Sequence, residues 1–306
     1  MDLVSEVLGR GAARQARLNL RDAIYRAHQA AWSAWARRRY RADFARVERF
    51  CLFVGYPRSG HSVVGAMLNA HPHAVISHEL DAAPLVLEGC PRDVLYARIL
   101  ARAYWFDLRG NRSNHDYQVP NQWQGRFAAL RVIGDKRGGA VTRCLAAHPD
   151  FLVRLRALVG VPLRLIHVVR NPFDNIAAIS IWHELGLPAA ADYYFMHCAT
   201  TARLGELCTP DELLSFRHEE MVRAPRTVLT RLCDFLGLEP EPGWLDACCG
   251  IVFPRPTGSA RRLQWPPELV ADVARRARAL PFLDGYAFAP ADAPAAAPFV
   301  ATTPTK

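Results

Sequence analysis

The sequence has 306 residues, of which 51% are hydrophobic, and a formal net charge of +9 with a pI near 9.4. A chain of this length can form one large α/β domain with appendages, and its charge favours an anionic partner such as a nucleotide, a nucleic acid or a membrane surface. It contains no run of about 18 uncharged apolar residues, and its first residues lack the apolar core of a signal peptide. We therefore expect no transmembrane segment and no secretory leader.

Residues 1–48 are rich in alanine and arginine, with interspersed aromatic residues. This composition predicts a basic helical N-terminal extension. One interpretation is contact of residues 12–48 with a membrane surface or a partner. The interpretation that we favour is a helix that packs on its own domain.

Beyond residue 48, short apolar runs alternate with helical patterns. The runs 50–56 and 163–170 have a continuous Val, Ile and Leu character, which is typical of parallel strands covered on both faces. The pattern predicts an α/β fold in which one open, P-loop-like parallel sheet is flanked by helices, within a single domain over residues 49–287. The expected strands are 50–56, 74–78, 130–135 and 163–170, with a helix over 62–70.

Two segments depart from this alternation. Residues 100–125 are aromatic, polar and irregular, which predicts an insertion over the ligand site. Residues 288–306 are rich in alanine and proline, which predicts a disordered tail.

The eight cysteines form no C-x-x-C pair, and several lie in apolar runs such as "ACCGIVF". This pattern favours buried, reduced thiols over a disulfide framework or a zinc site. We therefore expect a cytoplasmic protein without a metal site.

The stretch "FVGYPRSGHSVVGAML" (53–68) places Arg58 in the turn where a strand passes into a helix. The first amides of a helix lack intrahelical partners and make its N-terminus electropositive, so a cation there is unfavourable unless an anion binds between them. The spacing from Gly55 to Ser62 matches a Walker A loop with histidine in place of its lysine. Asp135, at the end of the third predicted strand, is followed at once by Lys136. Because a lysine beside the site supplies positive charge, a magnesium ion is less necessary. The loop predicts an anion site that needs no metal.

The loop "YPRSGHS" resembles the 5′-phosphosulfate loop of sulfotransferases, whose sulfuryl donor is 3′-phosphoadenosine-5′-phosphosulfate (PAPS). The resemblance implies the sulfotransferase fold. It also implies that the donor's 5′-phosphate is bound by the loop residues Arg58, Ser59, Gly60, His61 and Ser62. His61 stands where the family has threonine or serine, so an imidazole must replace that hydroxyl or the hydrogen bond is lost.

A second stretch, "LRLIHVVRNPFDNIAAISIWHE" (163–184), resembles the family's 3′-phosphate motif. Arg170 would pair with the 3′-phosphate, for which a guanidinium is well suited. Asn171 and Pro172 are typical of the N-cap and first residue of a helix. The family's serine eight residues after the arginine is absent, because position 178 is alanine. Ser180 lies about 200° further around a helix and is not an obvious substitute.

Two further stretches extend the resemblance to about residue 270. In "FRHEEMVRAPRTVLTRLCDFLGLEP" (216–240), His218 stands where the family commonly has tyrosine near the adenine. The segment "PTGSARRLQWPPE" (256–268) resembles the basic segment that closes over the nucleotide, which makes Arg261 and Arg262 candidates for donor binding.

Sulfuryl transfer needs a base at the acceptor and positive charge at the leaving oxygen. The resemblance implies that Glu79, in "AVISHEL", is the base, and its neighbour His78 is the competing candidate. We expect the second strand to lie beside the first, so that Glu79 faces the loop. Lys136 would add charge at the leaving oxygen, although pairing with Asp135 is an equal alternative.

The sequence is therefore interpreted as a PAPS-dependent sulfotransferase that acts without metal on a hydroxyl or amine of a small-molecule, glycan or peptide acceptor. The alternatives are a P-loop nucleotide kinase or NTPase, and a PAPS-binding relative without activity. Only the net charge favours a nucleic-acid partner.

Overall fold

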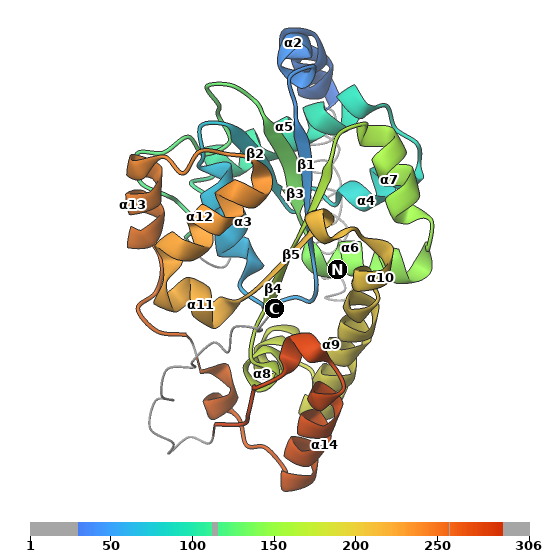
Figure 1. The fold of residues 1–306 in the computed structure, drawn as a ribbon, viewed down its shortest axis with the longest axis vertical. Helices are drawn as coiled ribbons and strands as arrows, with labels where there is room; N and C mark the ends of the chain where they lie inside the picture. The colour runs from blue at the N-terminus through green and yellow to red at the C-terminus, as the bar shows by residue number, and fades with distance from the viewer. Residues whose placement is uncertain (1–29, 112–115, 257, 290–306) are drawn as a thin grey trace, which may run out of the picture.

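The structure is a computed structural model that describes residues 30–111, 116–256 and 258–289 (Figure 1). Most of the expected disordered tail and of the basic N-terminal extension lies outside these residues. Among the described residues, no helix is both long and apolar enough to cross a membrane. All eight cysteines are free thiols.

Within the described residues, five parallel strands form one open sheet in the order β2-β3-β1-β4-β5. The fold is therefore α/β, as predicted. The fifth strand, which we did not predict, is an edge strand with only one fully buried residue, so its apolar pattern is weak. The strands are β1 (Arg49–Val54), β2 (Ala74–His78), β3 (Val132–Lys136), β4 (Leu163–Val169) and β5 (Leu213–Arg217).

The prediction that the second strand lies beside the first is wrong, because β3 lies between β2 and β1. Gly134 of β3 is opposite Cys51 of β1, and a Cβ atom at Gly134 would lie 2.1 Å from the Cys51 carbonyl oxygen. The chain leaves β1 toward one edge of the sheet and leaves β3 toward the other, so these neighbours form the switch point where ligands bind in open α/β sheets.

Helices cover both faces of the sheet and the end where its strands finish (Figure 1). One face is covered by α3 (His61–Asn69), α11 (His218–Arg223), α12 (Pro225–Leu236) and α13 (Pro242–Gly250). The other is covered by α4 (Ala82–Leu87), α5 (Arg92–Leu108), α6 (Gly138–Ala147) and α7 (Phe151–Val159).

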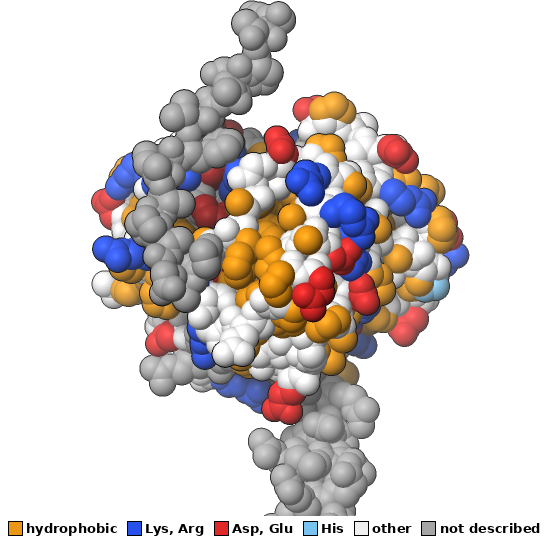
Figure 2. Space-filling view, turned by 90° about the horizontal axis from the view of Figure 1, so that it is seen from below, with side chains coloured by type: hydrophobic (Ala, Val, Ile, Leu, Met, Phe, Trp, Pro, Cys, Tyr) orange, Lys and Arg blue, Asp and Glu red, His pale blue; other side chains and the backbone are white. Residues whose placement is uncertain are grey.

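A third group of helices lies beyond the carboxyl ends of the strands. Seen from this end, hydrophobic side chains gather near the middle, with acidic and basic side chains beside them (Figure 2). The group contains α8 (Pro172–His183), α9 (Leu187–Ala202), α14 (Pro267–Arg278) and the 3-10 turns η2 (Ser259–Arg262) and η3 (Pro281–Leu283). The remaining short elements are α2 (Arg41–Phe44), α10 (Leu204–Leu207) and η1 (Pro210–Glu212).

The expected irregular insertion over residues 100–125 is wrong for residues 100–108, which form the second half of α5. Leu100, Ala103 and Phe106 of this helix are buried at helical spacing, a period that the surrounding aromatic and arginine residues obscure.

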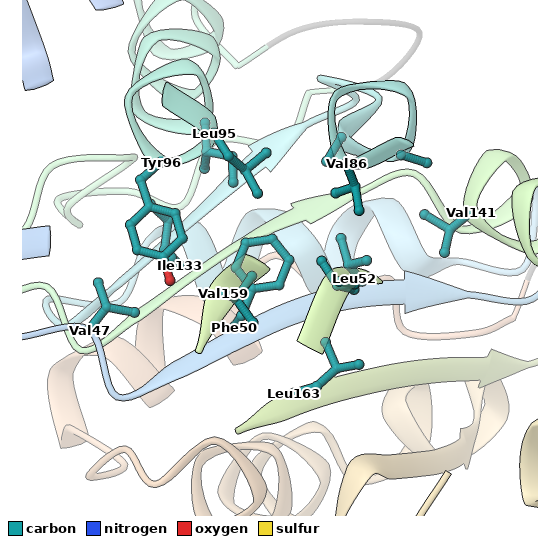
Figure 3. Close-up of a cluster of buried hydrophobic side chains, with 14 of the residues drawn as sticks. Val47, Phe50, Leu52, Val86, Leu95, Tyr96, Ile133, Val141, Val159 and Leu163 are labelled. Atoms are coloured by element: carbon teal, nitrogen blue, oxygen red, sulfur yellow. The ribbon is translucent and has the colours of Figure 1, made fainter. Parts of the chain in front are cut away.

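The core is built on β1, whose side chains are buried on both sides of the sheet. Phe50 and Leu52 point to the face covered by α4 and α5, where Phe50 stacks on Tyr96 with ring centroids 6.1 Å apart (Figure 3). Burial of each such side chain stabilises the fold by about 2 kcal/mol. Phe44 and Val47 join this cluster, so the described part of the N-terminal extension packs on the domain.

Asp135 of β3 is fully buried and fixes the turn that follows β2. Its carboxylate accepts hydrogen bonds from the Ser77 hydroxyl (2.7 Å) and the amides of Leu80 (3.0 Å) and Ala82 (3.1 Å). Burial raises the pKa of Asp135, although these hydrogen bonds oppose the rise. The turn carries Glu79, so Asp135 determines where that side chain begins.

We predict that Asp135→Ala lowers the free energy of unfolding by about 3 kcal/mol, because buried donors would lose their acceptor. Urea denaturation measures the change. The control is Asp150→Ala, which removes an exposed carboxylate paired with Arg154 and should leave the free energy of unfolding almost unchanged. Equal effects of the two substitutions would contradict the structural role of Asp135.

Candidate functional site

The loop between β1 and α3 has the backbone that an anion-binding turn needs. Gly55, Arg58 and Gly60 have positive φ angles of 107°, 67° and 97°. A side chain at Gly60 would also collide with His218, because its Cβ would lie 2.4 Å from the imidazole Cδ2. Gly60 is the N-cap of α3 and offers no capping side chain, so the first amides of α3 face the loop.

Side chains from neighbouring helices hold this loop in place. Thr142 of α6 accepts a hydrogen bond from the Gly55 amide at 2.8 Å, and Asn175 of α8 donates to the Pro57 carbonyl at 2.9 Å. The sequence analysis missed both residues. A buried amide in the apolar run "FDNIAAIS" is the one signal that could have indicated Asn175.

His61 and Ser59 form a buried pair beneath the loop. The Ser59 hydroxyl lies 3.0 Å from His61 Nδ1. Burial, together with the charge of Lys136, lowers the pKa of His61 to about 3, so the imidazole is neutral at pH 7. The histidine that replaces the family's hydroxyl residue is thus engaged with a neighbouring serine. Direct binding of phosphate by either side chain stays a prediction.

Lys136, at the end of β3, connects the loop to Glu79. Its ammonium donates to the Ser62 hydroxyl at 2.9 Å and to Glu79 Oε1 at 2.8 Å. The Lys136 side chain is 1% exposed and that of Glu79 is 46% exposed. The alternative pairing of Lys136 with Asp135 is not formed, because the Asp135 oxygens accept from Ser77 of β2 and from two amides of the turn after β2. The structure brings Lys136, Ser62 and Glu79 together although β2 and β1 are not neighbours.

The charge of Lys136 controls the ionisation of Glu79. Burial of the carboxyl opposes ionisation, but the charge and hydrogen bond of Lys136 outweigh it and lower the pKa of Glu79 to about 2. Burial lowers the pKa of Lys136 in turn, and Glu79 opposes that shift. Glu79 is therefore ionised at neutral pH and is a weak base while the pair is intact.

His78 has a different environment from its neighbour Glu79. Its ring stacks on Phe106 with centroids 4.1 Å apart and an interplanar angle of 1°, and the side chain is buried. Burial and the charge of Lys136 lower the pKa of His78 to about 3. Its carbonyl accepts a hydrogen bond from Arg102 at 2.8 Å. Of the two candidates, Glu79 is the more exposed.

Arg58 extends from the loop over the indole of Trp182, with its guanidinium carbon 4.7 Å from the ring centroid. The Nε atom of Arg58 is buried and has no hydrogen-bond partner. Trp182 is half-exposed near the end of α8 and was missed by the sequence analysis. This cation–π contact orients Arg58 on the α8 side of the loop.

Arg170 follows β4 and is buried beside the loop. It donates to the Arg58 carbonyl at 2.9 Å and to the Ser259 hydroxyl at 3.2 Å, so it joins the loop to η2. Burial lowers the pKa of Arg170. As expected, α8 begins with Asn171 as its cap and Pro172 as its first residue. Ser180 donates to the Leu185 carbonyl at 2.6 Å and does not replace the hydroxyl that is absent at Ala178.

The three remaining predicted residues lie around Arg170. His218 begins α11 against Gly60, and burial together with the charge of Arg170 lowers its pKa to about 4. Arg261 and Arg262 are exposed in η2, which is held on α8 by a 2.8 Å hydrogen bond from the Ala260 amide to Asp174. Contact of these residues with a donor nucleotide stays a prediction.

A family model described as the sulfotransferase family matches residues 52–242, which is more than half of the chain. The chain therefore belongs to the sulfotransferase family. The match spans the loop, Glu79, Lys136 and Arg170, and it ends before η2. No curated protein sequence is detectably similar to the chain.

Several solved sulfotransferase structures are distantly similar. A sulfotransferase domain from the curacin biosynthetic pathway is 18% identical, with a TM-score of 0.48 over 77% of this chain and 100% of its own. A sulfotransferase domain from the Synechococcus PCC 7002 olefin synthase is 21% identical, with a TM-score of 0.48 over 76% of this chain and 94% of its own. Mouse sulfotransferase SULT7A1, complexed with PAP, is 12% identical, with a TM-score of 0.42 over 76% of this chain and 84% of its own. The family assignment rests on the sequence match, because these similarities are remote.

We predict that stability falls as the pH is lowered from 7 to 5. In the folded protein the pKa values of His61, His78 and His218 are about 3, 3 and 4, whereas unfolded histidine titrates near 6.5. Below pH 6.5 the unfolded chain therefore binds protons that the folded chain does not, which costs about 1 kcal/mol per pH unit for each imidazole. Urea denaturation at both pH values measures the loss, and His61→Thr should reduce the slope. A pH-independent stability would contradict the prediction.

Proposed function

We propose that the protein transfers the sulfuryl group of PAPS to a hydroxyl or amine of an acceptor, with Glu79 as the general base. The observation that carries the proposal is the contact of one buried ammonium, Lys136, with both Ser62 of the loop and Glu79. A base and a cation at the leaving group are the two groups that in-line sulfuryl transfer requires. In this member of the sulfotransferase family, Glu79 would be the base, and the neighbouring Lys136 would be the cation at the leaving group.

The charges of the site suit a donor with two anionic groups. The α3 N-terminus, Arg58 and Lys136 would bind the 5′-phosphosulfate, and Arg170 would bind the 3′-phosphate. The buried Nε of Arg58, which lacks a partner, supports this assignment, because an anion would supply one. Arg170 is tied to the Arg58 carbonyl, so both phosphate groups would bind to one connected structure.

The proposed reaction is balanced by these residues. A lone pair of the acceptor oxygen or nitrogen forms the new S–O or S–N bond, and the acceptor proton passes to the Glu79 carboxylate. The electron pair of the cleaved S–O bond stays on the 5′-phosphate, so 3′-phosphoadenosine-5′-phosphate leaves. Lys136 and Arg58 stabilise the charge that grows on this oxygen.

The kinase or NTPase alternative is less well supported. Such an enzyme uses a strand-end aspartate and the loop serine to hold magnesium. Here the Asp135 oxygens accept hydrogen bonds from Ser77 and two amides, and the Ser62 hydroxyl accepts from Lys136. These contacts favour a loop whose counter-cation is an ammonium.

We predict that Arg170→Ala weakens binding of 3′-phosphoadenosine-5′-phosphate by about 2–3 kcal/mol, or about 30- to 150-fold in Kd, because a charge-assisted contact is lost. Binding of adenosine 5′-phosphate should fall much less. Calorimetry with both nucleotides measures the difference, and thermal unfolding checks that the variant is folded. Equal losses for the two nucleotides would mean that Arg170 acts only through the Arg58 carbonyl.

We predict that Glu79→Gln binds the nucleotide at least as tightly as the native protein and lowers turnover by about 10²- to 10⁴-fold, the usual contribution of a positioned base. Turnover is measured with labelled PAPS and an acceptor library. The comparison variant is His78→Ala, which should cost much less. Full activity of the Gln variant would pass the base role to another group. Nucleotide binding without turnover of any acceptor in the native protein would support a non-catalytic relative.

A further inference from the structure

The ammonium of Lys136 is shared between two groups that lie after different strands. The Nζ atom contacts Ser62, in the first turn of α3, and Glu79, after β2. A lysine side chain that is 1% exposed is costly to charge without a counter-ion. In the structure Glu79 supplies that counter-charge.

The aliphatic stem of Lys136 (Cβ and Cγ) packs on α3, whereas rotation about the bonds beyond it can redirect the ammonium. The stem lies across Gly65, where a Cβ atom would be 2.7 Å from Lys136 Cγ and 3.0 Å from Lys136 Cβ. Glycine inside a helix is unfavourable relative to alanine. The close approach of Lys136 explains why α3 has a glycine there. Rotation about the last side-chain bonds can move Nζ between Glu79 and the start of α3 without moving the backbone.

Resting on the proposed function, we propose that Lys136 passes from Glu79 to the anion bound at the start of α3, so that donor binding releases the Glu79 carboxylate to act as the base. Both anions compete for one ammonium, and the phosphosulfate also gains the amides of the helix N-terminus. The carboxylate becomes a stronger base when it loses the hydrogen bond and the nearest charge of Lys136. Glu79 would then take the proton from the acceptor only when the donor is bound.

Other charged groups near Glu79 do not replace Lys136. His78, beside it on the chain, and His61, on α3, also act on the carboxyl, and both are neutral at pH 7. Arg102 donates to the His78 carbonyl, and its charge acts on His78 and Lys136. Loss of Lys136 therefore removes the cation that lowers the pKa of the Glu79 carboxyl most. The expected consequence is that a bound acceptor is deprotonated only after the donor has bound.

Calorimetry with 3′-phosphoadenosine-5′-phosphate tests the competition directly. Glu79→Gln should bind this nucleotide about fivefold more tightly than the native protein, because the competing carboxylate is gone. Equal or weaker binding by the variant would overturn the proposal and make Glu79 a group that only positions Lys136. No nucleotide binding by the native protein would instead overturn the proposed function.

Proton uptake provides a readout that a structural role would not change. Binding at pH 5 is measured in buffers of different ionisation enthalpy. The native protein should take up more protons than Glu79→Gln, because only its carboxylate gains a proton when Lys136 leaves. The protonation of the nucleotide itself cancels in this difference. Equal uptake by the two proteins would overturn the proposal.

Gly65→Ala tests the role of the stem. The added methyl group should displace Lys136, weaken nucleotide binding and abolish the effect of Glu79→Gln in the double variant. The matched control is Gly205→Ala, because a Cβ atom at that position meets nothing within 4 Å. If Gly65→Ala binds the nucleotide like the native protein and keeps the effect of Glu79→Gln, the stem has no such role.

Discussion

The buried ammonium of Lys136 is the group on which the arrangement of the site depends. It lies at the end of β3, and the sheet order places β3 between the strand that leads into the loop and the strand that leads to Glu79. A buried lysine without an anion would destabilise the fold, so the turn after β2 must bring a carboxylate to it. Asp135, the neighbour of Lys136 on β3, fixes that turn from the inside. One strand thus supplies both the cation and the anchor for its counter-ion.

The positive charges converge because parallel strands end at the same edge of the sheet. Arg58 and Arg170 follow β1 and β4, Lys136 is the last residue of β3, and these three strands are adjacent. Their charges add to that of the α3 N-terminus, while burial keeps His61, His78 and His218 neutral. This concentration of fixed charge is costly in an empty site and favourable around a ligand with two phosphate groups.

The sequence analysis was most successful where the chain carries continuous local patterns. Apolar runs predicted four of the five strands, and "YPRSGHS" and the arginine after β4 indicated the family that the sequence match shows. It failed where a pattern was weak or non-local. The edge strand β5 lacks a continuous apolar run, and the helical period of α5 is obscured by its aromatic residues. In the sequence Trp182 and Asn175 resemble ordinary helix residues, because their contacts with the loop exist only in the folded chain.

By itself the sequence determined the α/β class, the glycine-bounded loop with its arginine, and the capped helix after Arg170, because each depends on neighbours in the chain. Only the tertiary structure decided that β3 separates β1 from β2, that Lys136 pairs with Glu79 rather than Asp135, and that Ser59 is turned toward His61. These outcomes depend on which strands pair and on which buried charge finds a counter-ion, and both are set by packing between segments that are distant in sequence.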